Sequence, residues 1–320
     1  MPTPEQHTLT VAIAQIAPTW LLRDKTISKV VDWTQQAADK GARLVAFGEA
    51  LVPGYPFWVA RTDGAQFDSP EQKKLYALYL DQGVQIEAGD LDPVCEAARK
   101  GNIAVYLGTM ERAADRGGHS LYCSMVYVSA AGKIESVHRK LMPTYEERLV
   151  WAPGDGHGLR THKLGAFTAG GLNCWENWLP LPRAALYAQG EDLHVAIWPG
   201  SIRNTEDITR FIACESRSYV VSVSGLMRST DIDPGLPGYE TLAATGEGLI
   251  ADGGSCLADP SGNWILEPAT GEESLRIATI DHARVREERQ NLDVVGHYSR
   301  PDVTRLKVNR KRQSTAAFKD

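Results

Sequence analysis

The sequence predicts a single-domain α/β fold in which helices cover the outer faces of a mixed sheet or of a pair of sheets. Helix and strand patterns alternate along the chain, and no linker rich in proline, glycine and serine divides it. The 320 residues are 43% hydrophobic and 23% charged, a composition typical of a globular protein that buries a sizeable core. We therefore expect one domain over residues 1–305 and a basic C-terminal tail over residues 306–320.

The first half of the chain opens with a strand-helix-strand pattern. Aliphatic runs predict strands, and amphipathic stretches predict helices. The expected strands are 9–16, 43–47, 103–110, 121–128 and 133–138, and the expected helices are 25–40, 70–80 and 91–100.

The second half repeats this alternation and then changes to strands separated by turn residues. The expected elements are a strand into Cys174, a helix over 182–189, a strand over 194–198, a helix over 206–218, and strands over 219–224, 255–258, 264–267 and 276–280. Residues 228–248, rich in glycine, proline and threonine, are long enough for a lid or an assembly contact. The last dozen residues are expected to form a mobile tail.

Composition and motifs exclude several function classes. The net charge of -6 disfavours a nucleic-acid surface, which needs clustered lysine and arginine. Five scattered cysteines without a Cys-x-x-Cys pair predict neither disulfides nor a zinc site, and favour a reducing cytoplasm. A signal peptide, an apolar stretch of membrane-spanning length, and the glycine-rich or His-Glu-x-x-His motifs of cofactor and metal sites are absent from the sequence. We expect no membrane, cofactor or metal.

Cys174 is the leading candidate for a reactive residue. It ends the apolar, glycine-bearing run Ala169-Gly-Gly-Leu-Asn-Cys174 and precedes Trp-Glu-Asn-Trp178. A strand end fixes a side chain at the carboxyl edge of a sheet, where open α/β sheets keep their ligand sites. A thiol nucleophile also needs a proton acceptor. His138, at the end of a predicted strand, is the most plausible histidine, and a carboxylate is an equal alternative.

Glu49 and Lys140 also follow predicted strands. Glu49 closes Val45-Ala-Phe-Gly-Glu49 and precedes an aromatic loop with two prolines, which is typical of a pocket wall. Lys140 would favour the thiolate of Cys174 and would stabilise negative charge on a substrate. For each residue taken alone, a solvated charge where a strand meets water is the simpler interpretation.

Glu147 lies in Thr144-Tyr-Glu-Glu147, a pattern that fits a helix capping box. In a capping box, the glutamate side chain accepts a hydrogen bond from the backbone of the threonine. Capping alone would explain this glutamate, and the spacing favours that interpretation over a catalytic one.

Together these segments resemble the nitrilase branch of the nitrilase and amidase superfamily over nearly the whole chain. Phe47-Gly-Glu49 is similar to the first-glutamate motif of that branch. The run from His138 to Trp151 is similar to its lysine and second-glutamate segment. The run from Leu172 to Arg183 is similar to the nucleophile segment of nitrilases rather than amidases, and Gly296-His-Tyr-Ser-Arg-Pro301 is similar to a late motif of the same branch.

The resemblance implies a four-layer α-β-β-α sandwich of two mixed sheets with outer helices. It implies Cys174 as nucleophile, Glu49 as general base, Lys140 as charge stabiliser and Glu147 as a second, supporting carboxylate. The implied reaction converts an organic nitrile to a carboxylic acid and ammonia through a cysteine thioimidate and thioester, without a cofactor. It further implies a homo-oligomer built from dimers, including helical assemblies.

The chain departs from the family pattern beside two site segments. Gly48 stands where proline is commoner, and Ala152-Pro153 stands where the family usually has glycine-rich sequence. These departures affect the expected shape of the loops and leave the four side chains intact.

Aromatic residues beside the site segments, or at a later strand end, are expected to line the substrate pocket. The candidates are Tyr55, Trp58, Trp175, Trp198 and Pro199. An aromatic wall would favour aryl or arylaliphatic nitriles, although core packing explains Trp175 and Trp198 equally well. An amidase or carbamoylase using the same four residues and a cyanide-hydrating enzyme are the alternatives. The intact residues disfavour a non-catalytic assembly protein.

Overall fold

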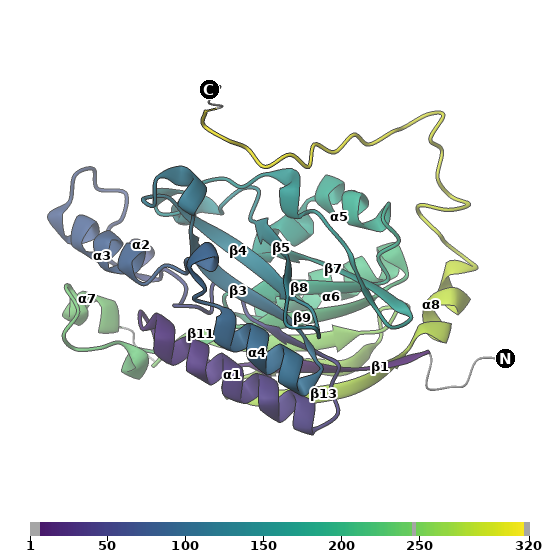
Figure 1. Cartoon of the computed structure of the whole chain (residues 1–320), viewed down its shortest axis with the longest axis horizontal. Coiled ribbons are helices and arrows are strands. Elements are labelled where there is room, and N and C mark those ends of the chain that lie inside the picture. The colour runs from purple at the N-terminus through teal and green to yellow at the C-terminus, as the bar shows by residue number, and fades with distance from the viewer. Residues whose placement is uncertain (1–6, 245–247, 317–320) are drawn as a thin grey trace.

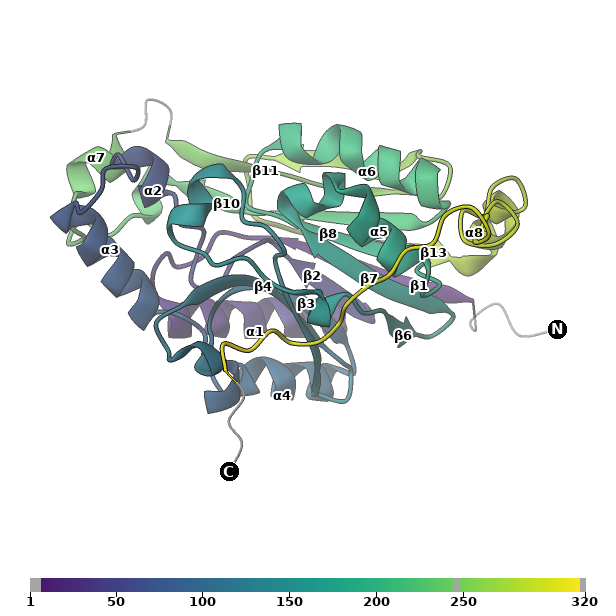
Figure 2. The same ribbon diagram turned by 90° about the horizontal axis from the view of Figure 1, so that it is seen from above.

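The computed structural model, which describes residues 7–244 and 248–316, has two β-sheets packed face to face with helices on both outer faces (Figure 1). Seen from above, the layers follow one another as helix, sheet, sheet and helix (Figure 2). The covering helices are α1 (Arg23–Asp39) and α4 (Asp92–Gly101) on one side, and α5 (Pro180–Tyr187) and α6 (Ile202–Ser216) on the other. The four-layer sandwich is therefore confirmed.

The first sheet brings two of the predicted site residues to one edge. Its strands are β1 (Thr8–Gln15), β2 (Leu44–Phe47), β3 (Ala104–Arg112), β4 (Leu121–Val128), β5 (Ile134–Arg139) and β13 (Ser274–Asp281), in the order β13-β1-β2-β3-β4-β5. Strands β1, β2 and β3 are parallel, β4 is antiparallel to β3, and β5 is antiparallel to β4. Strand β5 therefore runs in the direction of β2, so Glu49 and Lys140 emerge at the same edge.

The second sheet carries Cys174. Its strands are β6 (His162–Leu164), β7 (Phe167–Asn173), β8 (Leu193–Trp198), β9 (Tyr219–Ser224), β10 (Leu226–Arg228), β11 (Leu249–Ala258) and β12 (Trp264–Thr270). The order is β10-β11-β9-β8-β7-β6, with β12 paired to β11. Strands β7, β8 and β9 are parallel. Cys174 and Pro199 therefore follow neighbouring strands at the same edge.

The main core lies between the two sheets, and further cores lie beneath the helices. Successive side chains of a strand point to opposite faces of a sheet. In β3, Tyr106 packs between the sheets, whereas Val105 packs in the core that includes α1 and α4. In β8, Val195 lies between the sheets and Trp198 packs with α6. Burial on both faces explains why these strands are nearly continuous apolar runs in the sequence.

Every predicted helix and strand has a counterpart in the structure. The elements without a prediction are mostly short, because three to five residues carry too little periodicity. Apart from 3₁₀ turns, they are β6, β10, α2 (Trp58–Arg61), α7 (Tyr239–Ala243) and α8 (His282–Arg289). Helix α8 is longer, but Val285 is its one buried residue, so it lacks the apolar stripe that predicts a helix.

Residues 228–248 fold more regularly than a long loop would, although residues 245–247 lie outside the described part. The segment contains a 3₁₀ turn over Ser229–Asp231 and helix α7, and it buries Ile232 and Leu242. Arg61 of α2 donates a hydrogen bond to the Leu242 carbonyl at 3.5 Å. The segment thus packs on α2 at one end of the sandwich, and its role as a lid stays a prediction.

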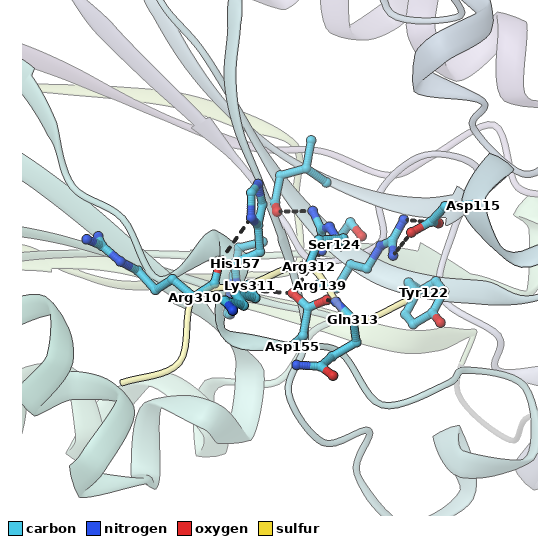
Figure 3. A network of polar contacts seen from close by, with 12 residues as sticks. Asp115, Tyr122, Ser124, Arg139, Asp155, His157, Arg310, Lys311, Arg312 and Gln313 are labelled. Atoms are coloured by element: carbon cyan, nitrogen blue, oxygen red, sulfur yellow. Dashed lines mark hydrogen bonds and ion pairs between the residues drawn. The ribbon is translucent and has the colours of Figure 1, made fainter. Parts of the chain in front are cut away.

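The segment after α8 crosses the molecule without regular structure (Figure 2), but part of it is bound to the domain. Arg312 forms an ion pair of 3.0 Å with the buried carboxylate of Asp155 and donates to the Val137 carbonyl at 3.2 Å (Figure 3). The backbone N–H of Gln313 also donates to Asp155, at 2.9 Å. Residues 312 and 313 are therefore held against the domain, because a buried carboxylate requires partners, and the mobility of the last dozen residues stays a prediction.

The helices of the described ranges are short. The longest, α1, has 17 residues, and none is long and apolar enough to cross a bilayer.

Candidate active site

Glu49, Lys140, Glu147 and Cys174 come together at the edges where the two sheets end. The Lys140 ammonium lies 2.9 Å from Oε1 of Glu49 and 2.7 Å from Oε2 of Glu147. One oxygen of each glutamate and the Cys174 sulfur lie within 4.8 Å of one another. None of the four residues is more than 2% exposed. The four positions predicted from the sequence thus form one buried cluster.

The backbone around Glu49 is held in place by contacts with two neighbouring strands. Its N–H donates to the carbonyl of Trp198, across to the second sheet, at 3.0 Å. Gly108 on β3 lies so close that a Cβ there would stand 2.1 Å from the Gly48 oxygen and 2.7 Å from the Glu49 Cα. Only glycine fits at position 108, which explains how the loop after β2 approaches its neighbour.

The two carboxylate oxygens of Glu49 differ in their surroundings. Oε1 accepts from Lys140 and, at 3.4 Å, from the thiol of Cys123 on β4. Oε2 is buried and has no hydrogen-bond partner among the described residues. Burial raises the pKa of Glu49 to about 7, with Lys140 lowering it and Glu147 raising it. At neutral pH the group is therefore poised to accept a proton, and Oε2 is the free acceptor.

Lys140 is anchored through its backbone on both sides. Its N–H donates to the Cys123 carbonyl and its carbonyl accepts from the Gly154 N–H, both at 2.7 Å. Burial lowers the pKa of the Lys140 ammonium, but Glu49 and Glu147 are among the groups that outweigh burial and raise it well above its usual value. Lys140 therefore stays charged.

Arg139, immediately before Lys140, points away from this cluster into a second ionic network. Its guanidinium forms an ion pair of 2.6 Å with Glu111 and one of 2.8 Å with Asp115, beside the docked tail (Figure 3). The strand that presents Lys140 is thus held by charged contacts on its other face.

Glu147 is both a capping residue and a member of the cluster. Oε2 accepts from the backbone N–H of Thr144 at 2.6 Å and from Lys140. Oε1 accepts from the hydroxyl of Tyr55 at 2.7 Å. The two interpretations of the Thr-x-x-Glu spacing are therefore compatible, because the carboxylate has enough acceptor sites for both.

Cys174 begins a 3₁₀ turn (Cys174–Trp178) with φ of +48°, a left-handed conformation that is strained for a residue with a side chain. Asn177 holds this turn by donating to the Cys174 carbonyl at 2.8 Å. Burial, followed by Glu49, raises the pKa of the Cys174 thiol well above its usual value. Lys140 lowers that pKa, as expected, but the other groups outweigh it. Cys174 is therefore a neutral thiol at rest and needs a base.

The carboxylates, and not His138, are the candidate proton acceptors. The imidazole of His138 is buried, and its Nε2 donates to Glu176 at 3.1 Å. The two glutamates and Cys174 would have a suitable geometry for a metal ion. However, the Lys140 ammonium already contacts both carboxylates and supplies the positive charge that a metal would bring.

The five predicted pocket residues differ in their burial and in their contacts with the cluster. Tyr55 reaches the cluster through its hydroxyl and meets Trp151 edge to face, with ring centroids 5.5 Å apart. Trp58 is buried and lines a surface cavity of about 420 Å³. Trp198 is fully buried in the same core cluster as Cys174. Trp175 is half exposed.

Pro199, the remaining predicted pocket residue, is partly buried after β8. For these five residues, contact with substrate stays a prediction.

Three residues around the cluster were not predicted. Cys123 contacts Glu49, and the ring of Trp151 lies 5.8 Å from the Lys140 ammonium. Glu176 accepts from the backbone N–H of Asn173 at 3.0 Å. The spacing Asn-x-x-Glu has the capping pattern that also contains Glu147, so it could have pointed to Glu176. Cys123 and Trp151 carry no comparable signal in the sequence.

Comparisons with known proteins agree with this geometry. The model of the family "Carbon-nitrogen hydrolase" matches residues 10–290. The chain is 35% identical to "Nitrilase 2" of an unknown prokaryotic organism, over 98% of this chain and 96% of that protein. It is 31% identical to an arylacetonitrilase of Aspergillus niger, over 93% and 91% of the two chains. It is 32% identical to an aliphatic nitrilase of Rhodococcus rhodochrous, over 95% and 84%.

A solved structure supports the fold. The carbon-nitrogen hydrolase from Helicobacter pylori G27 superposes with a TM-score of 0.71, at 21% identity, over 92% of this chain and 97% of that one.

Proposed function

The chain belongs to the carbon-nitrogen hydrolase family, in its nitrilase branch, and we propose that it hydrolyses an organic nitrile to a carboxylic acid and ammonia. The observation that carries this proposal is the unpartnered Oε2 of Glu49 in one buried cluster with the Cys174 thiol and the charged Lys140. A nucleophile, a base and a charge stabiliser are the groups that the reaction needs.

In the first half of the proposed reaction, the Cys174 sulfur adds to the nitrile carbon and Glu49 takes the thiol proton. The proton passes to the nitrile nitrogen, and a covalent thioimidate results. Lys140 and the backbone N–H of Trp175, a group that lowers the pKa of the Cys174 thiol, would stabilise the charge that develops on the nitrogen.

In the second half, a water molecule gives a proton to Glu49 and adds to the thioimidate carbon. The tetrahedral intermediate expels its nitrogen, after protonation, as ammonia, and leaves a thioester on Cys174. A second water molecule, again deprotonated by Glu49, releases the carboxylic acid and restores the thiol. Glu147 supports these steps by holding the Lys140 ammonium at 2.7 Å.

We propose aryl or arylaliphatic nitriles as substrates, because aromatic side chains lie beside the buried cluster. Tyr55 and Trp151 pack edge to face beside the Lys140 ammonium. The relatives include both an arylacetonitrilase and an aliphatic nitrilase at similar identity, so sequence similarity does not favour either class. Comparable turnover of acetonitrile and phenylacetonitrile would contradict this assignment.

An amidase or carbamoylase is the second candidate, because the same four residues would also attack an amide. The curated relatives above all bear nitrilase names, which favours the nitrile. A cyanide-hydrating enzyme is a narrower form of the same chemistry. Product analysis separates these candidates: a nitrile converted mainly to amide, an amide consumed faster than its nitrile, or loss of cyanide would each replace the nitrilase assignment.

We also propose that the chain forms homo-oligomers and works in a reducing cytoplasm. Large apolar side chains are exposed around α5 and α6, namely Trp175, Trp178, Leu179, Leu181 and Phe211. All five cysteines are free, as expected of a reducing compartment. Light scattering of the purified protein tests the assembly, and a monomer at micromolar concentration would contradict it.

The direct test of function is incubation of the purified protein with phenylacetonitrile, with phenylacetic acid and ammonia measured separately. We expect equal amounts of the two products, and no turnover by Cys174→Ala. Cys256→Ala is the matched control, because Cys256 is also a buried cysteine but belongs to β11, and its thiol contacts Thr209. An active Cys174→Ala protein would overturn the proposal.

A further inference from the structure

Glu176, two residues after Cys174, is a buried carboxylate that the proposed reaction does not use. Its Oε1 accepts from the N–H of Leu141 at 2.6 Å, and its Oε2 accepts from the N–H of Asn173 at 3.0 Å. Nε2 of His138 lies 3.3 and 3.1 Å from the same two oxygens. Glu176 is 1% exposed and His138 is also 1% exposed. Three donors therefore converge on one carboxylate.

These hydrogen bonds join the backbones on which the lysine and the nucleophile are carried. Leu141 directly follows Lys140 at the end of β5, in the first sheet. Asn173 directly precedes Cys174 at the end of β7, in the second sheet. Glu176 thus bridges the two sheets at the point where each presents a residue of the cluster.

The bridge consists of groups with little freedom to move. His138 is held on its other side by Gly158, where a Cβ would stand 2.2 Å from the His138 Cα. Burial raises the pKa of Glu176, but its interaction with His138 and the hydrogen bonds from Leu141 and Asn173 outweigh burial and lower the pKa below its usual value. Glu176 therefore stays an acceptor-only carboxylate at neutral pH.

A second buried carboxylate and histidine pair offers a comparison. Asp192 is 6% exposed, its Oδ2 lies 2.9 Å from Nε2 of His282, and its Oδ1 accepts from the backbone N–H of Thr168 at 2.7 Å. Thr168 is the second residue of β7, at the opposite end of that strand from Cys174, and His282 begins α8. The hydrogen bonds of this pair therefore lead to neither Cys174 nor Lys140.

We propose that Glu176 is a positioning residue that sets the place of Lys140 relative to Cys174 by joining the ends of β5 and β7. This inference rests on the proposed roles of Lys140 and Cys174. Because the two side chains come from different sheets, their spacing depends on contacts that cross between the sheets. A displacement of about 1 Å in a catalytic site is sufficient to reduce a rate by about 100-fold.

The test replaces Glu176 with glutamine, which has the same shape but a single acceptor oxygen. Its NH₂ group would face one of the N–H donors that the carboxylate now satisfies. We expect kcat for phenylacetonitrile to fall by about 30-fold to 100-fold, while KM changes by less than about threefold. We expect Asp192→Asn to lose thermal stability to a similar extent but to keep kcat within about threefold.

A second measurement is independent of nitrile turnover. The rate at which iodoacetamide alkylates Cys174 is followed by peptide mass spectrometry across pH, with exposed Cys214 as internal reference. In Glu176→Gln we expect alkylation at Cys174 to slow by at least about tenfold and its pH midpoint to rise, because Lys140 no longer favours the thiolate. Alkylation of Cys214 is expected to be unchanged.

The outcomes separate this inference from the proposed function. If the wild type turns over no nitrile but the alkylation of Cys174 depends on Glu176, the proposed function fails and the positioning role stands. If Glu176→Gln keeps normal alkylation and turnover, or if Asp192→Asn loses as much of both, the positioning role is overturned. Should Glu176→Gln not fold, Glu176→Asp, whose shorter side chain cannot span both N–H groups, is measured against the same criteria.

Discussion

Replacement of Glu49 by glutamine is expected to stabilise the fold at neutral pH while removing most of the activity. Glu49 and Glu147 share one ammonium, that of Lys140, and all three side chains are buried. With both carboxylates ionised the group carries a net negative charge, which is unfavourable in a buried site. Glutamine keeps an acceptor for Lys140 and removes that charge.

The size of the effect follows from the pKa of Glu49, which burial raises from 4.5 to about 7. That rise corresponds to a cost of about 3 kcal/mol for keeping Glu49 ionised in the folded state. Between pH 4.5 and 7 the folded wild type binds more protons than the unfolded chain, so its stability falls as pH rises through this window. The glutamine variant does not lose stability in this way. Its free energy of unfolding relative to that of the wild type should therefore rise by about 3 kcal/mol between pH 4.5 and 7, and should stay constant above pH 7.

Thermal unfolding at pH 5, 6, 7 and 8 measures this difference in stability. For a chain of 320 residues, it corresponds to a Tm of the variant that rises by about 5 °C relative to the Tm of the wild type. Turnover should fall by about 100-fold or more, because the general base is lost. The exposed Glu87→Gln is the control, with no pH-dependent gain. A Tm difference that is the same at all four pH values, or that shrinks as pH rises, would show that ionisation of Glu49 does not destabilise the fold.

Three further predictions follow from individual contacts. Tyr55→Phe removes a hydrogen bond to the Glu147 carboxylate and should lower the free energy of unfolding by about 2 kcal/mol, measured by chemical denaturation, and kcat by about tenfold. Cys174→Gly should unfold at a higher temperature than Cys174→Ala, by about 1 kcal/mol in stability, because glycine relieves the strain of φ at +48°. Arg312→Ala should lower the free energy of unfolding by about 1 kcal/mol, measured by thermal unfolding, because Asp155 loses a partner that is itself partly exposed.

Each of these predictions has an outcome that would contradict it. A Tyr55→Phe protein with unchanged kcat would mean that Glu147 needs no support from the hydroxyl. Equal stability of the glycine and alanine variants at position 174 would mean that the nucleophile turn is not strained. If Arg305→Ala, a change at an exposed tail residue, lowers the stability as much as Arg312→Ala does, the docking of the tail does not depend on Asp155.

Much of the fold was predictable because the strands are long aliphatic runs that end at polar residues. The ends of the runs before Glu49, Lys140 and Cys174 were therefore visible in the sequence, and the resemblance to nitrilases linked them. The spacing around Glu147 predicted only a helix cap. In the structure, the same carboxylate oxygen accepts from the Thr144 N–H, as in a cap, and also from Lys140. Local spacing cannot reveal this second contact.

Other features depend on contacts between residues far apart in the chain. Strand β5 presents Lys140 at the edge of Glu49 only because two antiparallel pairings lie between β3 and β5. Cys123 reaches Glu49 through the same arrangement. Asp155 and Arg312 are 157 positions apart in the chain, so a polar tail could not be distinguished from a docked one by composition.

Mass spectrometry most directly tests whether Cys174 carries the substrate's carbon as a covalent intermediate. The protein is mixed with phenylacetonitrile, quenched in acid during turnover, and digested. We expect the phenylacetyl group, or its imidate precursor, on the peptide that contains Cys174, and no such adduct in Cys174→Ala. Turnover without any adduct on Cys174, or an adduct on another residue, would contradict the account.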